Sequence, residues 1–91
     1  MILDYDQQEI IRKHLTELLD KRAYPKTICP SEVARALTEE ELQKLNAYDW
    51  RDTMEDVRAL VWEMREYGDV EVLQKGKVVR VKSLENIEDV N

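Results

Sequence analysis

The sequence predicts a small, mainly helical domain that closes with a two-stranded β-hairpin. A capped amphipathic helix follows Arg51 and gives way, at Gly68-Asp69, to short runs of β-branched and apolar residues that are divided by Lys75-Gly76. Two shorter helical patterns and one extended piece come before it. The predicted order is therefore helix, short strand, helix, helix and two-stranded wing, which is the order of a winged helix-turn-helix domain.

Length and composition favour one domain without covalent or metal support. The chain has 91 residues, so we expect a single winged-helix-like domain spanning residues 1–91. Charged residues make up 37% of the sequence and predict a surface of solvated, ion-rich helices. Cys29 is the one cysteine, which excludes an internal disulfide and favours a reducing compartment. The first residues lack the basic region and apolar run of a signal peptide, and no apolar stretch approaches the roughly 20 residues of a membrane span. We therefore expect a cytoplasmic protein.

The first helix is predicted for residues 6–22. Asp6 is the expected N-cap, and Glu9 completes a capping box three residues later. Apolar residues then recur at helical spacing, namely Ile10, Ile11, Leu15, Leu18 and Leu19. His14 lies among them and has no second His or thiolate nearby in the sequence, so we interpret it as a half-buried packing residue and not as a ligand.

The middle of the chain predicts a short strand and two short helical segments. Residues 27–29 are expected to be extended, and Pro30 suits the first position of a helix over residues 30–37. Thr38 and Glu41 repeat a capping box, which predicts another turn or two of helix. Cys29 is a candidate reactive thiol if it lies exposed at the helix start, but a buried, small apolar residue is the favoured interpretation.

The longest pattern predicts a helix over residues 53–67, with Asp52 and Glu55 as its cap and Gly68 as its end. The residues expected on its buried face are Met54, Val57, Leu60, Val61, Met64 and Tyr67. The residues expected on its outer, acidic face are Glu55, Asp56, Glu63 and Glu66.

A stripe of arginines lies between these two faces. Arg51, Arg58 and Arg65 are seven residues apart, and Trp62 belongs to the same stripe. Because Arg58 and Arg65 stand four residues before and three residues after Trp62, either guanidinium can stack on its indole. The favoured interpretation is structural, with the stripe clamping neighbouring helices.

The hairpin is predicted at residues 70–74 and 77–81, with Lys75-Gly76 as a two-residue loop, and it should pack beside residues 27–29. The alternation of apolar and polar residues slips at 72–73 and 78–79, which leaves the register and a bulge open. The acidic tail, residues 82–91, is expected either to form a short amphipathic helix or to fray.

Charge is unevenly distributed along the chain. The net charge is -6, but residues 74–82 hold four basic groups and no acidic group. A local positive feature is therefore expected on an acidic body, so that attraction of phosphate by the whole protein is not expected.

Three segments resemble those of a small bacterial family of uncharacterised domains with a winged-helix shape. They are Thr27–Leu37, Trp50–Arg58 and Gln74–Val79. The resemblance covers about residues 6–81 and implies the fold, but no activity, cofactor or catalytic residue. Residues 38–49 and the acidic tail depart from the shortest members of that family.

An enzyme is the function class that the sequence favours least. One His, one Cys and two Gly exclude a glycine-rich phosphate loop, a zinc site of Cys and His, and the familiar nucleophile-and-base motifs. The acidic clusters at residues 39–41 and 55–56 are explained by helix starts, where the helix dipole favours negative charge. We therefore expect no catalytic residue, cofactor, metal or small-molecule substrate.

The favoured function is a non-enzymatic interaction module that mediates protein–protein contact or self-association. Exposed aromatic and apolar groups are typical of such surfaces. The candidate contact residues are Tyr48, Trp50, Trp62, Leu84, Ile87 and Val90. The expected partner is another protein or a second copy of this chain, and no membrane.

The alternative is a DNA-binding domain of the transcription-regulator type that uses the basic wing. Winged-helix domains often place the third helix in the major groove and the wing along the phosphate backbone. The candidate nucleic-acid contacts are Arg51, Arg58, Arg65, Lys75, Lys77, Arg80 and Lys82. Carboxylates on the outer face of the third helix repel phosphate, so the sequence favours the protein module over this alternative.

Overall fold

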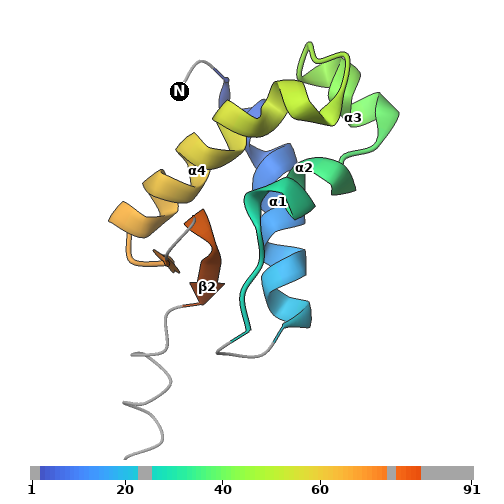
Figure 1. Cartoon of the computed structure of the whole chain (residues 1–91). Coiled ribbons are helices and arrows are strands. Elements are labelled where there is room, and N and C mark those ends of the chain that lie inside the picture. The colour runs from blue at the N-terminus through green and yellow to red at the C-terminus, as the bar shows by residue number, and fades with distance from the viewer. Residues whose placement is uncertain (1–2, 23–25, 74–75, 81–91) are drawn as a thin grey trace, which may run out of the picture.

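The computed structural model describes residues 3–22, 26–73 and 76–80. The chain is mainly helical, with a small antiparallel hairpin in a winged-helix-like arrangement (Figure 1). Its elements are α1 (Tyr5–Lys21), α2 (Pro30–Ala36), α3 (Glu39–Lys44), the 3-10 turn η1 (Trp50–Thr53), α4 (Met54–Glu66), β1 (Val70–Val72) and β2 (Val78–Arg80). The predicted helices at 6–22, 30–37 and 53–67 are confirmed to within a residue or two at each end. The predictions for residues 74–75 and 81–91 fall outside the described residues.

The N-cap of helix α1 lies two residues before the predicted one. Asp4, and not Asp6, is the N-cap: the Gln7 N–H donates to Asp4 Oδ1 (2.8 Å), and the Asp4 N–H donates to Gln7 Oε1 (3.1 Å). A glutamine closes a capping box as well as a glutamate does, so the helix begins at Tyr5 and Asp6 lies within its first turn. Ile11, Leu15 and Leu19 form the buried stripe of this helix.

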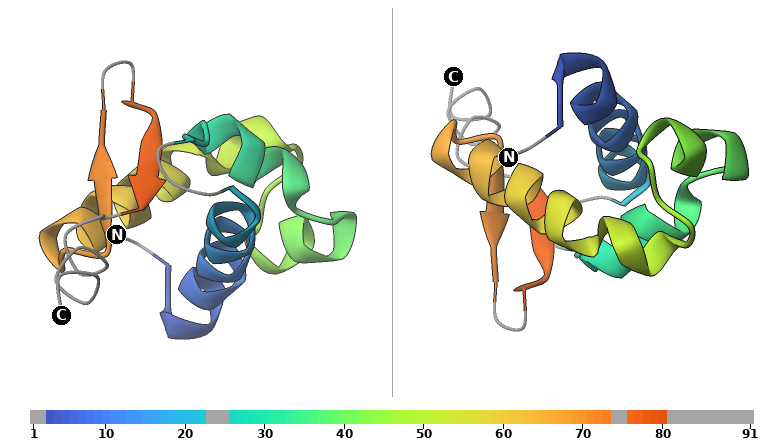
Figure 2. Two further views of the ribbon diagram at one scale, coloured as in Figure 1. Left: turned by 90° about the horizontal axis from the view of Figure 1, so that it is seen from below. Right: turned by 90° about the horizontal axis from the view of Figure 1, so that it is seen from above.

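The short helices α2 and α3 are stabilised by the residues at their N-termini. Pro30 stands at the start of α2, where it removes no helical hydrogen bond. Thr38 caps α3 as predicted, because its side chain accepts from the Glu41 N–H (3.1 Å). Asn46 then turns the chain with a φ of 59°. Helix α3 lies at the opposite end of the molecule from the hairpin, as the two views of Figure 2 show.

Helix α4 continues directly from η1, and this changes the predicted cap. The carboxylate of Asp52 accepts from the N–H groups of Tyr48 (3.1 Å) and Asp49 (3.2 Å). Asp52 therefore stabilises the chain before η1 and does not cap α4. At the other end, Gly68 has a φ of 82°, and the Asp69 N–H donates to the Met64 carbonyl (2.9 Å). This pattern is a Schellman motif, which needs the left-handed conformation that glycine adopts most readily.

The two predicted faces of α4 are only partly correct. Val57, Leu60, Val61 and Met64 are buried, as expected, whereas Tyr67 is 74% exposed. The helical wheel does not hold for Tyr67 because this residue is already the C-cap. On the outer face, Glu55 and Glu66 are exposed, but Asp56 and Glu63 are half-buried. The acidic face is therefore narrower than the sequence predicted.

The hairpin pairs in a regular antiparallel register, with Val70 opposite Arg80 and Val72 opposite Val78. Its connection is one residue longer than the predicted loop. The Leu73 N–H donates to the Lys77 carbonyl (2.7 Å), which leaves residues 74–76 between the last paired residues. Gly76 has a φ of 76°, and loops of this length need one residue in that left-handed region.

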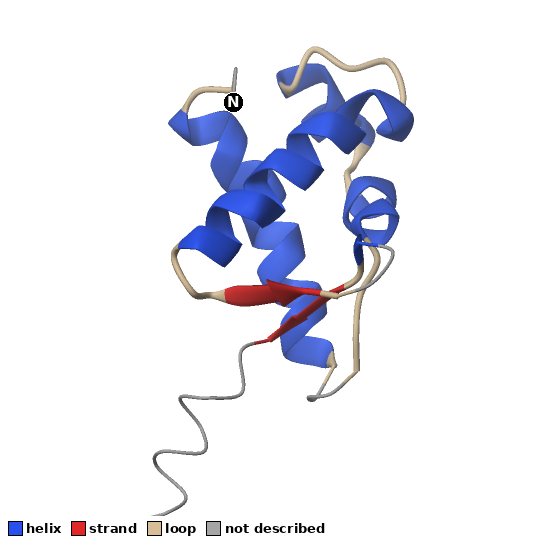
Figure 3. Cartoon of the chain, turned by 60° about the vertical axis from the view of Figure 1, so that its left-hand side comes forward, coloured by secondary structure: helices blue, strands red, loops and turns tan. Residues whose placement is uncertain are grey.

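The hairpin joins the segment before α2, as predicted. Ile28 forms an isolated antiparallel bridge with Val78, and each N–H donates to the other carbonyl at 2.8 Å. Figure 3 shows the strands directly below the C-terminal end of α4. The core that these elements enclose consists of Ile11, Leu15, Leu19, Ile28, Val33, Ala34, Leu37, Leu45, Val57, Leu60, Val61, Met64, Val70 and Val78.

Candidate functional site

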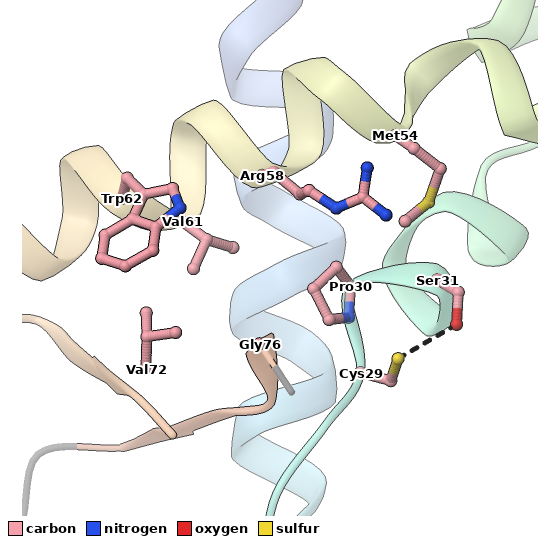
Figure 4. Close-up of a pocket in the computed structure, with 9 residues that line it drawn as sticks. All are labelled: Cys29, Pro30, Ser31, Met54, Arg58, Val61, Trp62, Val72 and Gly76. Carbon is pink, nitrogen blue, oxygen red and sulfur yellow. Dashed lines mark hydrogen bonds between the residues drawn. The ribbon is translucent and has the colours of Figure 1, made fainter. Parts of the chain in front are cut away.

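A groove lies where the start of α2, one side of α4 and the hairpin meet (Figure 4). Its volume is about 200 Å³. The lining residues are Cys29, Pro30, Ser31, Met54, Arg58, Val61, Trp62, Val72 and Gly76. Apolar side chains dominate this lining, and Arg58 is the one charged residue among the described residues that form it.

Helical spacing and strand pairing bring the three elements to the groove. Helix α4 supplies Met54, Arg58, Val61 and Trp62, which follow helical spacing and therefore share one side of the helix. The bridge between Ile28 and Val78 holds the hairpin against the segment that leads into α2. The groove is thus a property of the tertiary fold, and no single stretch of sequence contains it.

Trp62 is the most prominent apolar group of the groove. Its side chain is 50% exposed, and the Arg65 guanidinium lies 5.2 Å from the centroid of its ring. Stacking of Arg65 on Trp62 confirms one of the two contacts that the arginine stripe predicted. The stack restricts the indole without covering it, so a large apolar surface remains available beside Val72 and Val61.

Arg58 gives the groove its charge. Its side chain extends from α4 toward Met54, so that the guanidinium lies at the α2 end of the groove (Figure 4). Within the part of the chain that the structure describes, Arg58 has no ion-pair partner. A guanidinium presents several N–H donors in a plane and binds carboxylates well.

Cys29 is less buried than the sequence predicted. It is half-buried at the start of α2 and lines the groove. The preceding residue, Ile28, which is bridged to Val78, takes the buried position instead. The Ser31 hydroxyl donates to the Cys29 sulfur (3.2 Å) and is the first cause that lowers the pKa of this thiol. Partial burial and the negative charge of Glu32 oppose this lowering of the pKa, and the positive charge of Lys77 adds to it.

Trp50 serves a different purpose from Trp62. It is half-buried against the core, with the guanidinium of Arg35 at 4.8 Å and that of Arg51 at 4.6 Å from its ring centroid. This arrangement clamps α2 to η1 and supports the structural interpretation of the stripe. Arg35 was not predicted, since it lies on another helix, fifteen positions before Trp50. Tyr48, by contrast, is fully exposed.

The candidate basic residues do not form one bare cationic surface. Arg51 pairs with Asp49 (2.9 Å), and Arg65 lies 3.6 Å from Glu66. Lys77 is exposed near the hairpin loop. The backbone of Arg80 belongs to β2. The remaining candidate contacts, Lys75, Lys82, Leu84, Ile87 and Val90, lie outside the described residues.

His14 makes a contact that the sequence did not reveal. Its Nε2 lies 2.8 Å from Glu41 Oε1, and the two side chains are mostly buried, so the pair links α1 to α3. The prediction that His14 is half-buried is confirmed, and the carboxylate partner is new. Among residues 3–22, 26–73 and 76–80, no group of three or more His, Cys, Asp and Glu residues is placed to hold a metal ion. None of the described helices has the length and apolar character needed to cross a membrane.

Comparison with known proteins extends the resemblance along the chain. A search of the curated proteins finds no match. A protein-family model matches residues 8–90, so it includes the segment 38–49 and most of the acidic tail as well as the three segments that carried the resemblance. The match covers most of the sequence, and the chain therefore belongs to the family described as Protein of unknown function (DUF3253).

Proposed function

We propose that this domain is a non-enzymatic protein-interaction module whose groove binds a short segment of a partner protein. The observation that carries the proposal is the half-exposed Trp62 in an apolar groove, together with Arg58, which has no ion pair with any described residue. Tryptophan and arginine are the residues most enriched among those that dominate binding energy at protein interfaces. The partner segment would combine apolar side chains for the groove with a carboxylate for Arg58. The single cysteine supports a cytoplasmic setting for this contact.

The size of the groove supports a peptide side chain over a small-molecule ligand. Sites that enclose a drug-sized molecule have volumes of roughly 300 to 1,000 Å³. The groove here is about 200 Å³ and is open to one side of the domain. A side chain that belongs to a larger partner can use such a space, because the remainder of the partner rests on the surrounding surface.

The winged-helix arrangement and the exposed Lys77 favour a second candidate, binding of duplex DNA. The charges around α4 weigh against it. Arg51 and Arg65 already have acidic neighbours, and Glu55 and Glu66 are exposed on the same helix. Binding to duplex DNA gains free energy when positively charged side chains release counterions from the phosphates. The surface around α4 has too few unpaired positive charges to gain much in this way. We therefore prefer the protein-interaction function.

Selection from a random peptide library displayed on phage tests the proposal. The full chain is expected to enrich peptides that carry Leu, Ile, Val or Phe together with Asp or Glu. A selected peptide should lose at least about tenfold in affinity with Trp62→Ala or Arg58→Glu, since central interface residues contribute more than about 1.4 kcal/mol. Lys13→Glu, an identical charge change at an exposed position of α1, is the matched control. Enrichment of no peptide, or equal losses in all three variants, would contradict the proposal.

A further inference from the structure

We infer that the chain's own acidic tail is an intramolecular ligand of the groove and competes there with the partner segment. This inference rests on the proposed function, because it names an occupant for the same groove. The occupant is residues 83–90, which follow β2 in the chain.

The chemistry of the tail complements that of the groove. Leu84, Ile87 and Val90 recur at a spacing of three residues, which allows them to share one side of the segment. Between them stand three acidic residues and no basic one, namely Glu85, Glu88 and Asp89. The groove offers apolar walls and the guanidinium of Arg58. The tail therefore complements it, with apolar groups for the walls and carboxylates for the guanidinium.

The path of the chain brings the tail close to the groove. Val72 lines the groove and pairs with Val78, whereas the last residue of β2, Arg80, pairs with Val70. Two strand residues span about 7 Å, so the tail begins within about that distance of the groove wall. Residues 81–84 add at most about 13 Å of reach. No long linker is needed to bring Leu84 to the groove.

Covalent attachment favours this occupant over the tail of a second copy. A short flexible connection gives an effective concentration in the millimolar range, so even a weak contact forms within one molecule. A partner segment must then displace the tail, which lowers the apparent affinity of the free domain.

The native Cys29 provides a direct test. It lines the groove and is the one cysteine of the chain, so Ile87→Cys in the full chain introduces a single partner for a disulfide. The bond requires the two Cα atoms to approach within about 7 Å. Mild oxidation is expected to yield a monomer that migrates faster on a non-reducing gel. Disulfide-linked dimers as the main product would overturn the intramolecular arrangement.

The rate of crosslinking separates docking from random collision. In the double variant Arg58→Glu and Ile87→Cys, repulsion of the acidic tail should slow formation of the bond about tenfold, which corresponds to about 1.4 kcal/mol. Lys13→Glu with Ile87→Cys carries the same change in net charge away from the groove and should react as fast as Ile87→Cys alone. Equal rates in all three proteins would show that the tail reaches Cys29 without docking, and would overturn the inference.

Binding of a display-selected peptide tells apart a failure of the inference from a failure of the proposed function. With Leu84→Ser and Ile87→Ser in the full chain, the peptide should bind several-fold more tightly, because the competing tail is weakened. Unchanged peptide affinity would overturn the inference while leaving the proposed function intact. Crosslinking that depends on Arg58, in a chain that selects no peptide, would support the inference and refute the proposed function.

Discussion

Glu32 joins the end of α1, the extended segment and the start of α2. Its two carboxylate oxygens accept from the Arg22 guanidinium at 2.9 and 2.6 Å, and one of them also accepts from the Cys29 N–H (2.7 Å). Arg22 in turn donates to the Thr27 carbonyl (3.0 Å). The hydrogen bonds from Arg22 are the first cause that lowers the pKa of Glu32. Through these contacts Glu32 positions Cys29, which lines the groove at the start of α2.

The first prediction concerns Glu32→Gln. The lowered pKa means that ionised Glu32 stabilises the folded chain above its unfolded pKa of about 4.3, and that this contribution is lost as the pH falls through the folded value. Because the pair is partly exposed, solvent screens it, and we expect a loss of up to about 1 kcal/mol at pH ~7. Urea denaturation near pH 7 and pH 3 measures the difference, which should shrink at the lower pH. Glu17→Gln, at an exposed position of α1, serves as the control; a difference that persists undiminished in acid would contradict the assignment.

Helix α4 contributes residues both to the hydrophobic core and to the adjacent groove. Val57 and Leu60 are fully buried, whereas Arg58 and Trp62, the residues that follow Val57 and Val61, line the groove. Core and groove residues are neighbours in the sequence of α4, so a measurement of stability is needed to tell the effects of substituting them apart.

The second prediction compares buried core positions with a position on the outer face of α4. Leu15→Ala and Val57→Ala remove fully buried aliphatic groups and should each lower the free energy of unfolding by about 1 to 4 kcal/mol, because cavities remain. Val61→Ala should fall in the same range, while Glu63→Ala should cost little. Chemical denaturation compares the four variants. Equally small effects at all four positions would show that the buried side of α4 is misassigned.

The third prediction concerns the hairpin loop. Gly76 has a φ of 76°, and a Cβ added there would meet no atom within 4 Å. The cost of Gly76→Ala therefore comes from backbone conformation alone, and we expect about 1 to 2 kcal/mol. Asn tolerates this conformation better, so Gly76→Asn should cost less than Gly76→Ala in thermal or chemical denaturation. Equal stability of Gly76→Ala and the natural chain would contradict the assigned loop geometry.

Periodicity predicted the elements, and local chemistry predicted part of their ends. The spacing of Ile11, Leu15 and Leu19 was sufficient for α1, but Asp4 and Asp6 both suit an N-cap, and the choice depends on Gln7 completing the box. The hairpin was predicted from its runs of valine. Its loop length was not, because the Leu73 to Lys77 hydrogen bond depends on pairing and not on the residues of the loop.

The candidate site was predictable only in part, since contacts between distant residues leave no local pattern. The stacking of Arg65 on Trp62 followed from helical spacing. The stacking of Arg35 on Trp50, and the approach of the hairpin to Cys29, required the tertiary fold. The groove was therefore missed, although Arg58 and Trp62 were both identified as candidates.

The whole molecule is an acidic chain whose described surface includes a partly apolar groove. The net charge of -6 opposes long-range attraction of nucleic acid, whereas a groove whose Arg58 has no ion pair among the described residues suits a short acidic and apolar segment. The winged-helix arrangement alone does not decide between these functions, because one fold supports many of them. The distinction must come from the chemistry of the surface that is used.

The fourth prediction follows from the basic run at residues 74–82. If the hairpin bound duplex DNA, removing Lys75 and Lys77 would weaken binding to every duplex and reduce the slope of log K against log salt by about one unit per lost phosphate contact. We expect instead that Lys75→Ala with Lys77→Ala leaves the affinity for a selected peptide within about threefold of the natural chain, since the peptide is held mainly by Trp62 and Arg58. Fluorescence anisotropy with the labelled peptide measures this, and a loss comparable to that of Arg58→Glu would contradict it.

The most direct test of the central claim is fluorescence anisotropy of the full chain with two labelled probes, a display-selected peptide and a random duplex, at low and moderate salt. We expect saturable binding of the peptide, which Trp62→Ala weakens by at least about tenfold, and no sub-micromolar binding of the duplex. Sub-micromolar, salt-sensitive binding of the duplex that is lost in the Lys75→Ala and Lys77→Ala variant, together with peptide binding indifferent to Trp62, would contradict it and establish the nucleic-acid function instead.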